Sequence, residues 1–285
     1  MLDQVAAAVG RRAGLNVTGA MREKLCRSLH RTAEARGVPV TVHLSEVVAD
    51  AAAQQRLVEE LTVHESSFFR DAGQLAAVAE HVLPTLPGPI RIWSAGCANG
   101  QEPYSLAMLL LERGHQNARV VATDISTRAL ARAEAGRYSD AALRGLSPER
   151  RAAWLARDGD DWSVAPAPRR MVTFARHNLA LDVPPFPPGA CQLIFCRNVL
   201  IYFAPEAMMT TITRMRDWLP PGGVLVLGAS ESLWRVTEMF DLVSLNEAFV
   251  YRKPAAAGAA ARAGSARGGS ASPGGRVAAG SRSRL

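Results

Sequence analysis

Residues 90–112 read IRIWSAGCANGQEPYSLAMLLLE, a short apolar run followed by a turn with two glycines and an apolar helical segment. An apolar strand that leads through a glycine turn into a helix is the opening unit of a doubly wound α/β domain, in which Gly96 and Gly100 let a ligand approach the backbone closely. The spacing is not the Gly-x-Gly-x-x-Gly of dinucleotide-binding folds. The stretch therefore predicts the fold class without identifying the ligand.

Three more short apolar runs lie downstream, at residues 119–123, 192–196 and 224–227, with helical stretches between them. This alternation predicts a parallel sheet that is covered by helices on both faces. The segment DLVSLNEAFVYRK, residues 241–253, predicts a terminal hairpin at the sheet edge. Residues 136–176 fit the alternation poorly and are rich in proline and charge, so we predict a small inserted β-subdomain there.

The regions on either side of the predicted sheet have different patterns. In residues 1–80, apolar residues recur at steps of three and four, which predicts a small all-α N-terminal domain with a linker helix. Prolines and Gly88 then mark a boundary, so we assign the α/β domain to residues 81–253. Residues 254–285 contain almost no large apolar side chain and are predicted to form a disordered basic tail.

The net charge of +7 is concentrated in the tail, whose arginines are Arg262, Arg267, Arg276, Arg282 and Arg284. The predicted folded body is therefore close to neutral, and we expect no nucleic acid partner for it. Two interpretations of the tail remain open: a solvated segment, or one that binds a membrane, nucleic acid or an acidic partner.

The four cysteines form no Cys-x-x-Cys pair and no spaced Cys/His cluster, so we expect no metal site and a reduced, cytoplasmic protein. The first residues have too short an apolar run for a signal peptide, and no window approaches the roughly 20 apolar residues of a transmembrane helix. The oligomeric state that we expect is a monomer.

The second predicted strand ends in Asp124. An acid about 20 residues beyond the glycine turn is placed to bind ribose hydroxyls in nucleotide-binding α/β folds. The turn and the acid together predict a nucleoside site, but they do not choose between a nicotinamide cofactor and S-adenosyl-L-methionine.

Six segments make that choice through a resemblance. They are HESSFFRD (64–71), WSAGCANGQEPYSLA (93–107), ATDIS (122–126), HNL (177–179), IFCRNVLIYF (194–203) and PGGVLVLGASESL (221–233). In this order and spacing they resemble the CheR family, whose members methylate glutamates of chemotaxis receptors. The segment VTGAMREKL, residues 17–25, is similar to the small N-terminal domain of that family.

The resemblance implies a Rossmann-like S-adenosyl-L-methionine-dependent methyltransferase that releases S-adenosyl-L-homocysteine. It implies that Arg70 pairs with the carboxylate of the methyl donor, as a guanidinium can do through two hydrogen bonds. It assigns Glu102 to the ammonium group and Asp124 to the ribose. Asn178 and the backbone of Leu179 would contact adenine.

Further residues follow from the same resemblance. Arg197 and Asn198 would line the cofactor site at the end of the fourth strand, and Tyr202 would lie near the reacting methyl group. We expect Arg70 and Tyr202 to be the catalytic residues. His64 and Ser66 stand where the family commonly has Asn and Thr, and both are expected to contact the cofactor.

The expected reaction needs no general base. A glutamate carboxylate has a pKa near ~4.3, so it is already ionised and nucleophilic at neutral pH. The enzyme has to align oxygen, methyl carbon and sulfur and remove water from the carboxylate. The expected partner is the cytoplasmic helical domain of methyl-accepting chemotaxis receptors, with the enzyme recruited to membrane receptor arrays.

Two alternatives of other kinds stay open at this point. An amino-group methyltransferase would carry an Asn/Asp-Pro-Pro-Tyr/Phe motif at the end of the fourth strand, and residues 182–186, DVPPF, are a near match that lies before that strand. A non-catalytic module that senses S-adenosyl-L-methionine would not need Arg70, Asp124 and Tyr202 together.

Overall fold

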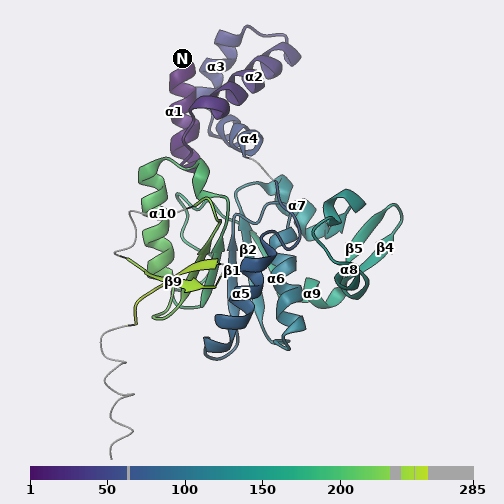
Figure 1. Ribbon diagram of the computed structural model, residues 1–285. Coiled ribbons are helices and arrows are strands. Elements are labelled where there is room, and N and C mark those ends of the chain that lie inside the picture. The colour runs from purple at the N-terminus through teal and green to yellow at the C-terminus, as the bar shows by residue number, and fades with distance from the viewer. Residues whose placement is uncertain (63–64, 232–238, 247, 256–285) are drawn as a thin grey trace, which may run out of the picture. The chain divides into compact units, whose positions relative to one another are not determined.

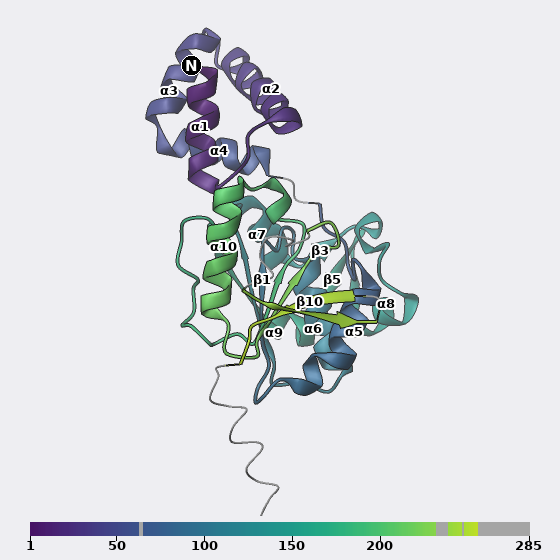
Figure 2. The ribbon, with the colours of Figure 1, turned by 60° about the vertical axis from the view of Figure 1, so that its left-hand side comes forward.

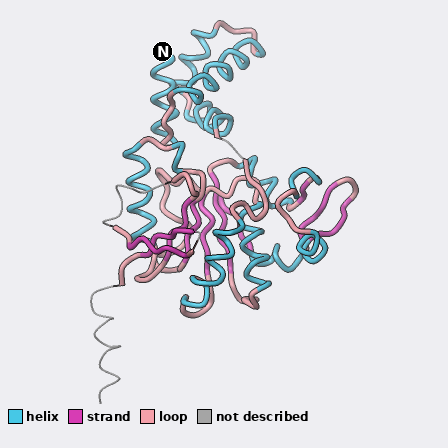
Figure 3. Tube along the Cα trace, in the orientation of Figure 1, coloured by secondary structure: helices cyan, strands magenta, loops and turns pink. Residues whose placement is uncertain are grey.

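The computed structural model describes residues 1–62, 65–231, 239–246 and 248–255 (Figures 1 and 3). The tail beyond residue 255 lies outside these ranges. The helices are α1 (Leu2–Ala13), α2 (Gly19–Ala35), α3 (Val40–Ala49), α4 (Ala51–Leu61), α5 (Ala72–His81), α6 (Gln101–Glu112), α7 (Thr127–Ala135), α8 (Pro148–Trp154), α9 (Pro166–Met171) and α10 (Pro205–Trp218), with 3-10 turns η1 (Leu83–Thr85), η2 (Asp140–Leu143) and η3 (Leu200–Tyr202).

A seven-stranded sheet forms the centre of the fold, with the order β6-β2-β1-β7-β8-β10-β9. Strands β6, β2, β1, β7 and β8 run parallel to one another, whereas β10 is antiparallel to both β8 and β9. The predicted parallel sheet with a terminal hairpin is therefore confirmed. The strands of this sheet are β1 (Arg91–Ala95), β2 (Arg119–Asp124), β6 (Val172–Arg176), β7 (Leu193–Cys196), β8 (Val224–Leu227), β9 (Asp241–Leu245) and β10 (Ala248–Arg252).

Strand β7 shows why the central runs are apolar throughout. Successive side chains of a strand point to opposite faces of the sheet. Leu193 and Phe195 pack in the core that α5 and α6 share, while Ile194 and Cys196 pack in the core formed with α10. Helices cover both faces, so no position of β7 is left for a polar residue (Figure 2).

The region after α7 contains a second, antiparallel sheet of β3 (Arg137–Tyr138), β5 (Asp161–Val164) and β4 (Leu155–Asp158). The predicted insertion is therefore present, but its expected end at residue 176 is wrong. Strand β6, Val172–Arg176, pairs in parallel with β2 as an edge strand of the main sheet. An edge strand is partly exposed, so its residues do not form the continuous apolar run of a central strand.

The first four helices surround a core of their own, which extends from Val5 to Leu61. Helix α5 is different, because Leu75, Val78 and Ala79 pack in the core of the main sheet. Residues Met1–Pro254 nevertheless form one compact unit. The division into domains at residue 80 therefore stays a prediction.

None of the helices within the described residues has the length and apolar character needed to cross a membrane.

Candidate active site

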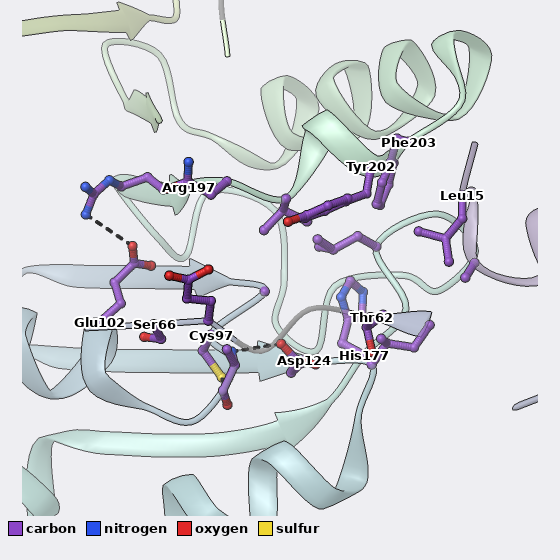
Figure 4. Close-up of a pocket in the computed structure, with 18 of the residues that line it drawn as sticks. Leu15, Thr62, Ser66, Cys97, Glu102, Asp124, His177, Arg197, Tyr202 and Phe203 are labelled. Carbon is purple, nitrogen blue, oxygen red and sulfur yellow. Dashed lines mark hydrogen bonds and ion pairs between the residues drawn. The ribbon is translucent and has the colours of Figure 1, made fainter. Parts of the chain in front are cut away.

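A pocket lies where several loops follow the carboxyl ends of β1, β2, β6 and β7 (Figure 4). Ala13, Leu15 and Met21 of the helical region also line it. Every predicted site residue that the structure describes is brought together here: Ser66, Arg70, Glu102, Asp124, Asn178, Leu179, Arg197, Asn198 and Tyr202. His64 lies outside the described residues.

The glycine turn after β1 forms one wall of the pocket. Gly96 adopts a φ of 81°, and a Cβ atom built on it would lie 2.5 Å from a methyl group of Val199. Only glycine allows the turn and the loop after β7 to approach this closely. Ala98 follows with a φ of 48° and donates its backbone N–H to Asp124 at 2.8 Å.

Asp124 is fixed at the end of β2 by hydrogen bonds to both of its carboxylate oxygens. Oδ2 accepts the Ala98 N–H, and Oδ1 accepts the N–H of Ser126 at 2.9 Å. Each carboxylate oxygen has two acceptor sites, so one carboxylate can accept several hydrogen bonds at once. A carboxylate held this way can bind a diol without reorganising first.

A buried ionic network joins β1, α6 and the end of β7. The Arg197 guanidinium, with a side chain only 2% exposed, pairs with Asp71 and lies 3.4 Å from Glu102. Glu102 also accepts a hydrogen bond of 2.7 Å from the Ser94 hydroxyl. Burial raises the pKa of Glu102 above its ordinary value, against the lowering effects of Arg197 and the Ser94 hydrogen bond. Glu102 is thus an acid held in place at the pocket wall.

The backbone on either side of Arg70 is closely constrained. Phe69 and Asp71 both adopt left-handed conformations, with φ values of 49° and 54°. The Phe69 N–H donates to the Ser105 hydroxyl at 2.9 Å, and the Arg70 carbonyl accepts from the Arg197 guanidinium at 2.9 Å. Strained conformations persist where surrounding contacts determine them. They direct the chain so that the exposed Arg70 side chain lines the pocket.

Asn178 has a structural contact that the sequence did not reveal. Its side-chain amide donates to the Arg12 carbonyl at 2.6 Å, and its Oδ1 accepts from the Ala180 N–H at 3.1 Å. Both polar atoms of the side chain therefore bind within the chain. Leu179, which follows in the same loop, also lines the pocket.

The loop after β7 supplies Asn198 and Tyr202. Asn198 has a φ of 59°, and its Oδ1 is a buried atom with no hydrogen-bond partner among the described residues. The Tyr202 ring lies over the pocket with its hydroxyl directed toward the interior (Figure 4). A buried acceptor without a partner is costly unless a ligand satisfies it.

Some lining residues were not predicted. Ile125 directly follows Asp124, and Cys97 lies within the glycine turn, so both had a signal in their neighbours. Leu15 had none, because it reaches the pocket through a bridge to Phe203. His177 is buried against Trp93 with 5.6 Å between ring centroids, and burial lowers its pKa, which favours the neutral ring.

The strand order, the antiparallel strand β10 between β8 and β9, and a pocket at the carboxyl ends of the parallel strands define a Rossmann-like methyltransferase fold. Residues 64–249 match the family described as "CheR methyltransferase, SAM binding domain". The chain belongs to the CheR methyltransferase family and is an S-adenosyl-L-methionine-dependent methyltransferase.

Relatives agree with this assignment. A chemotaxis protein methyltransferase of Vibrio parahaemolyticus is 40% identical over 73% of this chain and 80% of its own. Chemotaxis protein methyltransferase 1 of Pseudomonas aeruginosa is 38% identical over 70% of this chain and 77% of its own. Among solved structures, the CcbJ methyltransferase from Streptomyces caelestis is 19% identical, covering 55% of this chain and 51% of its own, with a TM-score of 0.35. The assignment rests on the sequence matches.

The pocket fits S-adenosyl-L-methionine by the chemistry of its donor and acceptor groups. The Asn198 Oδ1 acceptor and the Glu102 carboxylate suit an ammonium group, and Asp124 suits ribose hydroxyls. The close approach at Gly96 leaves backbone atoms at the pocket surface. When bound, the cofactor supplies a methyl group on a positively charged sulfur.

Proposed function

We propose that this enzyme transfers the methyl group of S-adenosyl-L-methionine to glutamate carboxylates of chemotaxis receptors and forms methyl esters. The observation that carries the proposal is the pocket itself, where Arg70, Asp124 and Tyr202 converge at the carboxyl ends of the strands. The names of the relatives, chemotaxis protein methyltransferases, support the choice of receptor.

The positions of the predicted site residues that the structure describes support a role for them in binding the cofactor. Arg70 reaches the pocket from a constrained backbone and would bind the cofactor carboxylate. Glu102 and Asn198 would receive the ammonium group, and Asp124 the ribose. Because the Asn178 side chain is engaged with Arg12, we assign the adenine contact to the backbone of Leu179. Ser66 and His64 complete the predicted set.

The substrate carboxylate is already ionised at neutral pH, so the pocket has to position it and exclude water. Figure 4 shows the Tyr202 ring over the pocket with its hydroxyl directed toward the interior, which supports a role for this hydroxyl near the reacting centre. The neutral, buried His177 suits a packing role better than that of a base.

Basic residues of the helical region would attract acidic receptor helices at longer range. Arg22, Arg27 and Arg31 form ion pairs with Asp3, Glu23 and Glu60, and the side chains of Arg27 and Arg31 remain 69% and 71% exposed. We infer that the enzyme works in the cytoplasm and is recruited to receptor arrays through such contacts.

The test is incubation of the protein with S-adenosyl-L-methionine labelled in the methyl group and a receptor cytoplasmic fragment. Mild base should release the label as volatile methanol, which identifies a carboxyl methyl ester. Asp124→Ala and Arg70→Ala should abolish labelling, whereas Asp217→Ala, at an exposed position on α10, should not.

Other outcomes would contradict the proposal. Label that resists base and resides on amide nitrogen or nucleic acid would favour an amino-group methyltransferase. Cofactor binding without any transfer to receptors of the same cell would favour a sensor.

A further inference from the structure

Glu231 is a buried carboxylate that no catalytic role explains. It is 7% exposed and lies four residues after the end of β8. Its two oxygens accept five backbone N–H groups. Oε2 accepts from Asn198 (2.7 Å) and Gly228 (2.9 Å), and Oε1 accepts from Val199 (2.8 Å), Leu200 (2.8 Å) and Ile201 (3.4 Å).

Four of these donors are consecutive residues, 198–201, at the end of β7. Successive backbone N–H groups can converge on one point in a turn that combines left-handed and right-handed residues, and the resulting concavity binds an anion. Asn198 has a φ of 59° and Val199 has φ −114° and ψ −48°, which meets this condition. Glu231 is the anion that occupies the concavity.

Gly228 gives an independent indication that these parts are fitted to one another. A Cβ atom at this position would lie 3.0 Å from Glu231 Oε2 and 3.1 Å from both the backbone nitrogen and Nδ2 of Asn198. A side chain at residue 228 would therefore press on the carboxylate and on the loop together.

The same loop carries two residues of the active site. Asn198 lines the pocket with its buried Oδ1, and Tyr202 follows Ile201 directly. The Tyr202 N–H donates to the Val199 carbonyl at 3.2 Å, so the turn that ends at Tyr202 starts from a residue that Glu231 holds.

We propose that Glu231 is a positioning residue for methyl transfer, which acts through the backbone of residues 198–201 to place Asn198 and Tyr202. This inference rests on the proposed function and adds a residue that lies behind the pocket wall. A carboxylate is needed because it accepts at both oxygens, whereas an amide accepts at one only.

The experiment compares the full-length wild-type enzyme with Glu231→Gln, Glu231→Asp and Gly228→Ala. Glu206→Gln, at an exposed acid on α10, is the matched control. Hydrogen exchange is measured by mass spectrometry on peptides that cover residues 197–203 and, as a reference, β1. Steady-state methylation gives kcat and KM, and calorimetry gives the affinity for S-adenosyl-L-methionine.

We expect Glu231→Gln to accelerate exchange in residues 197–203 at least tenfold and to leave β1 unchanged. We expect kcat to fall at least tenfold while KM for the cofactor changes less than about threefold, because loop placement affects the transition state more than binding. Glu231→Asp should recover part of kcat, and Gly228→Ala should reproduce the loss of kcat from the other side of the contact.

Faster exchange with an unchanged kcat would overturn the proposal, since the contact would then serve stability alone. The proposal would also be overturned if Glu231→Gln lowered kcat and accelerated exchange in β1 as much as in residues 197–203. If both Glu231 variants fail to fold, Gly228→Ala remains as the test. A kcat in this variant equal to that of the wild-type enzyme would overturn the proposal. Failure of the proposed function can be distinguished from failure of this inference. In the first case the wild-type enzyme would methylate no receptor, while Glu231→Gln would still accelerate exchange in residues 197–203.

Discussion

The Asn178 side-chain amide donates a hydrogen bond of 2.6 Å to the carbonyl oxygen of Arg12, near the end of α1. This contact connects the helical region to the loop after β6. We expect Asn178→Asp to lower the free energy of unfolding by about 1–3 kcal/mol, because a carboxylate would face the Arg12 carbonyl in a buried site. Urea denaturation measures the loss. Asn117→Asp, on an exposed turn, should change it by less than about 0.5 kcal/mol, and equal losses would contradict the role of the contact.

Arg197→Met should be strongly destabilising. The substitution leaves the buried Glu102 and the Arg70 carbonyl without their guanidinium partner. Removing one member of a buried ion pair costs about 3 kcal/mol or more. Denaturant unfolding checks this, with Arg27→Met as the control, because that arginine is paired with Glu23 on an exposed helix face. A control that loses as much stability as the variant would contradict the expectation.

Tyr202→Phe removes only the hydroxyl that lies over the pocket. We expect kcat for receptor methylation to fall about tenfold to a hundredfold with little change in KM, because in the proposed function the hydroxyl would contact the reacting centre and not the remote parts of either substrate. The comparison is Tyr251→Phe, at a buried tyrosine on β10, which should retain wild-type kcat. A rise in KM alone would assign the hydroxyl to binding.

The cysteines should differ sharply in reactivity. Burial raises the pKa of Cys191 to about 12, and it raises the pKa values of Cys97 and Cys196 well above the ordinary range. Cys26 on α2 is only half-buried. A disulfide reagent at pH 8 should therefore modify one thiol quickly in the native protein and all four after denaturation. Cys26→Ser should abolish the fast phase, and a fast phase that persists would contradict the burial of the others.

Glu102 should give stability an unusual pH dependence. Its folded-state pKa is raised, so its contribution to stability is present below its unfolded pKa and is lost as pH rises through the folded value. Glu102→Gln lacks this titration. The difference in Tm, variant minus wild type, should therefore increase from about pH 4 into the mildly acidic range.

Glu149 provides a control of opposite sign. Hydrogen bonds to backbone N–H and to Ser147 lower its pKa. Its contribution is present above the unfolded pKa and is lost as pH falls through the folded value. The Tm difference for Glu149→Gln should decrease as pH rises, and slopes of the same sign in both variants would contradict these assignments.

The central strands were predictable because they are buried on both faces. Residues 120–122 and 224–227 have continuous apolar runs for this reason. Strand β6 was placed in the insertion because an edge strand needs no such run. Asp124 was predictable from its position at the end of the second strand, and Glu102 followed from the family resemblance; both line the pocket. Leu15 and Glu231 were not, because each acts through contacts with residues far away in the chain.

The walls of the pocket come from segments as far apart as Ala13 and Phe203. No N-terminal fragment of the chain that lacks these later segments can therefore form the complete pocket for the methyl donor. A movement that separates α1 from the loop after β6 would likewise break the pocket apart. A ligand that binds only the complete fold stabilises it, by about 2.7 kcal/mol at a concentration of one hundred times Kd. The concentration of methyl donor would thus affect the lifetime of the folded enzyme in the cell as well as its rate of methylation.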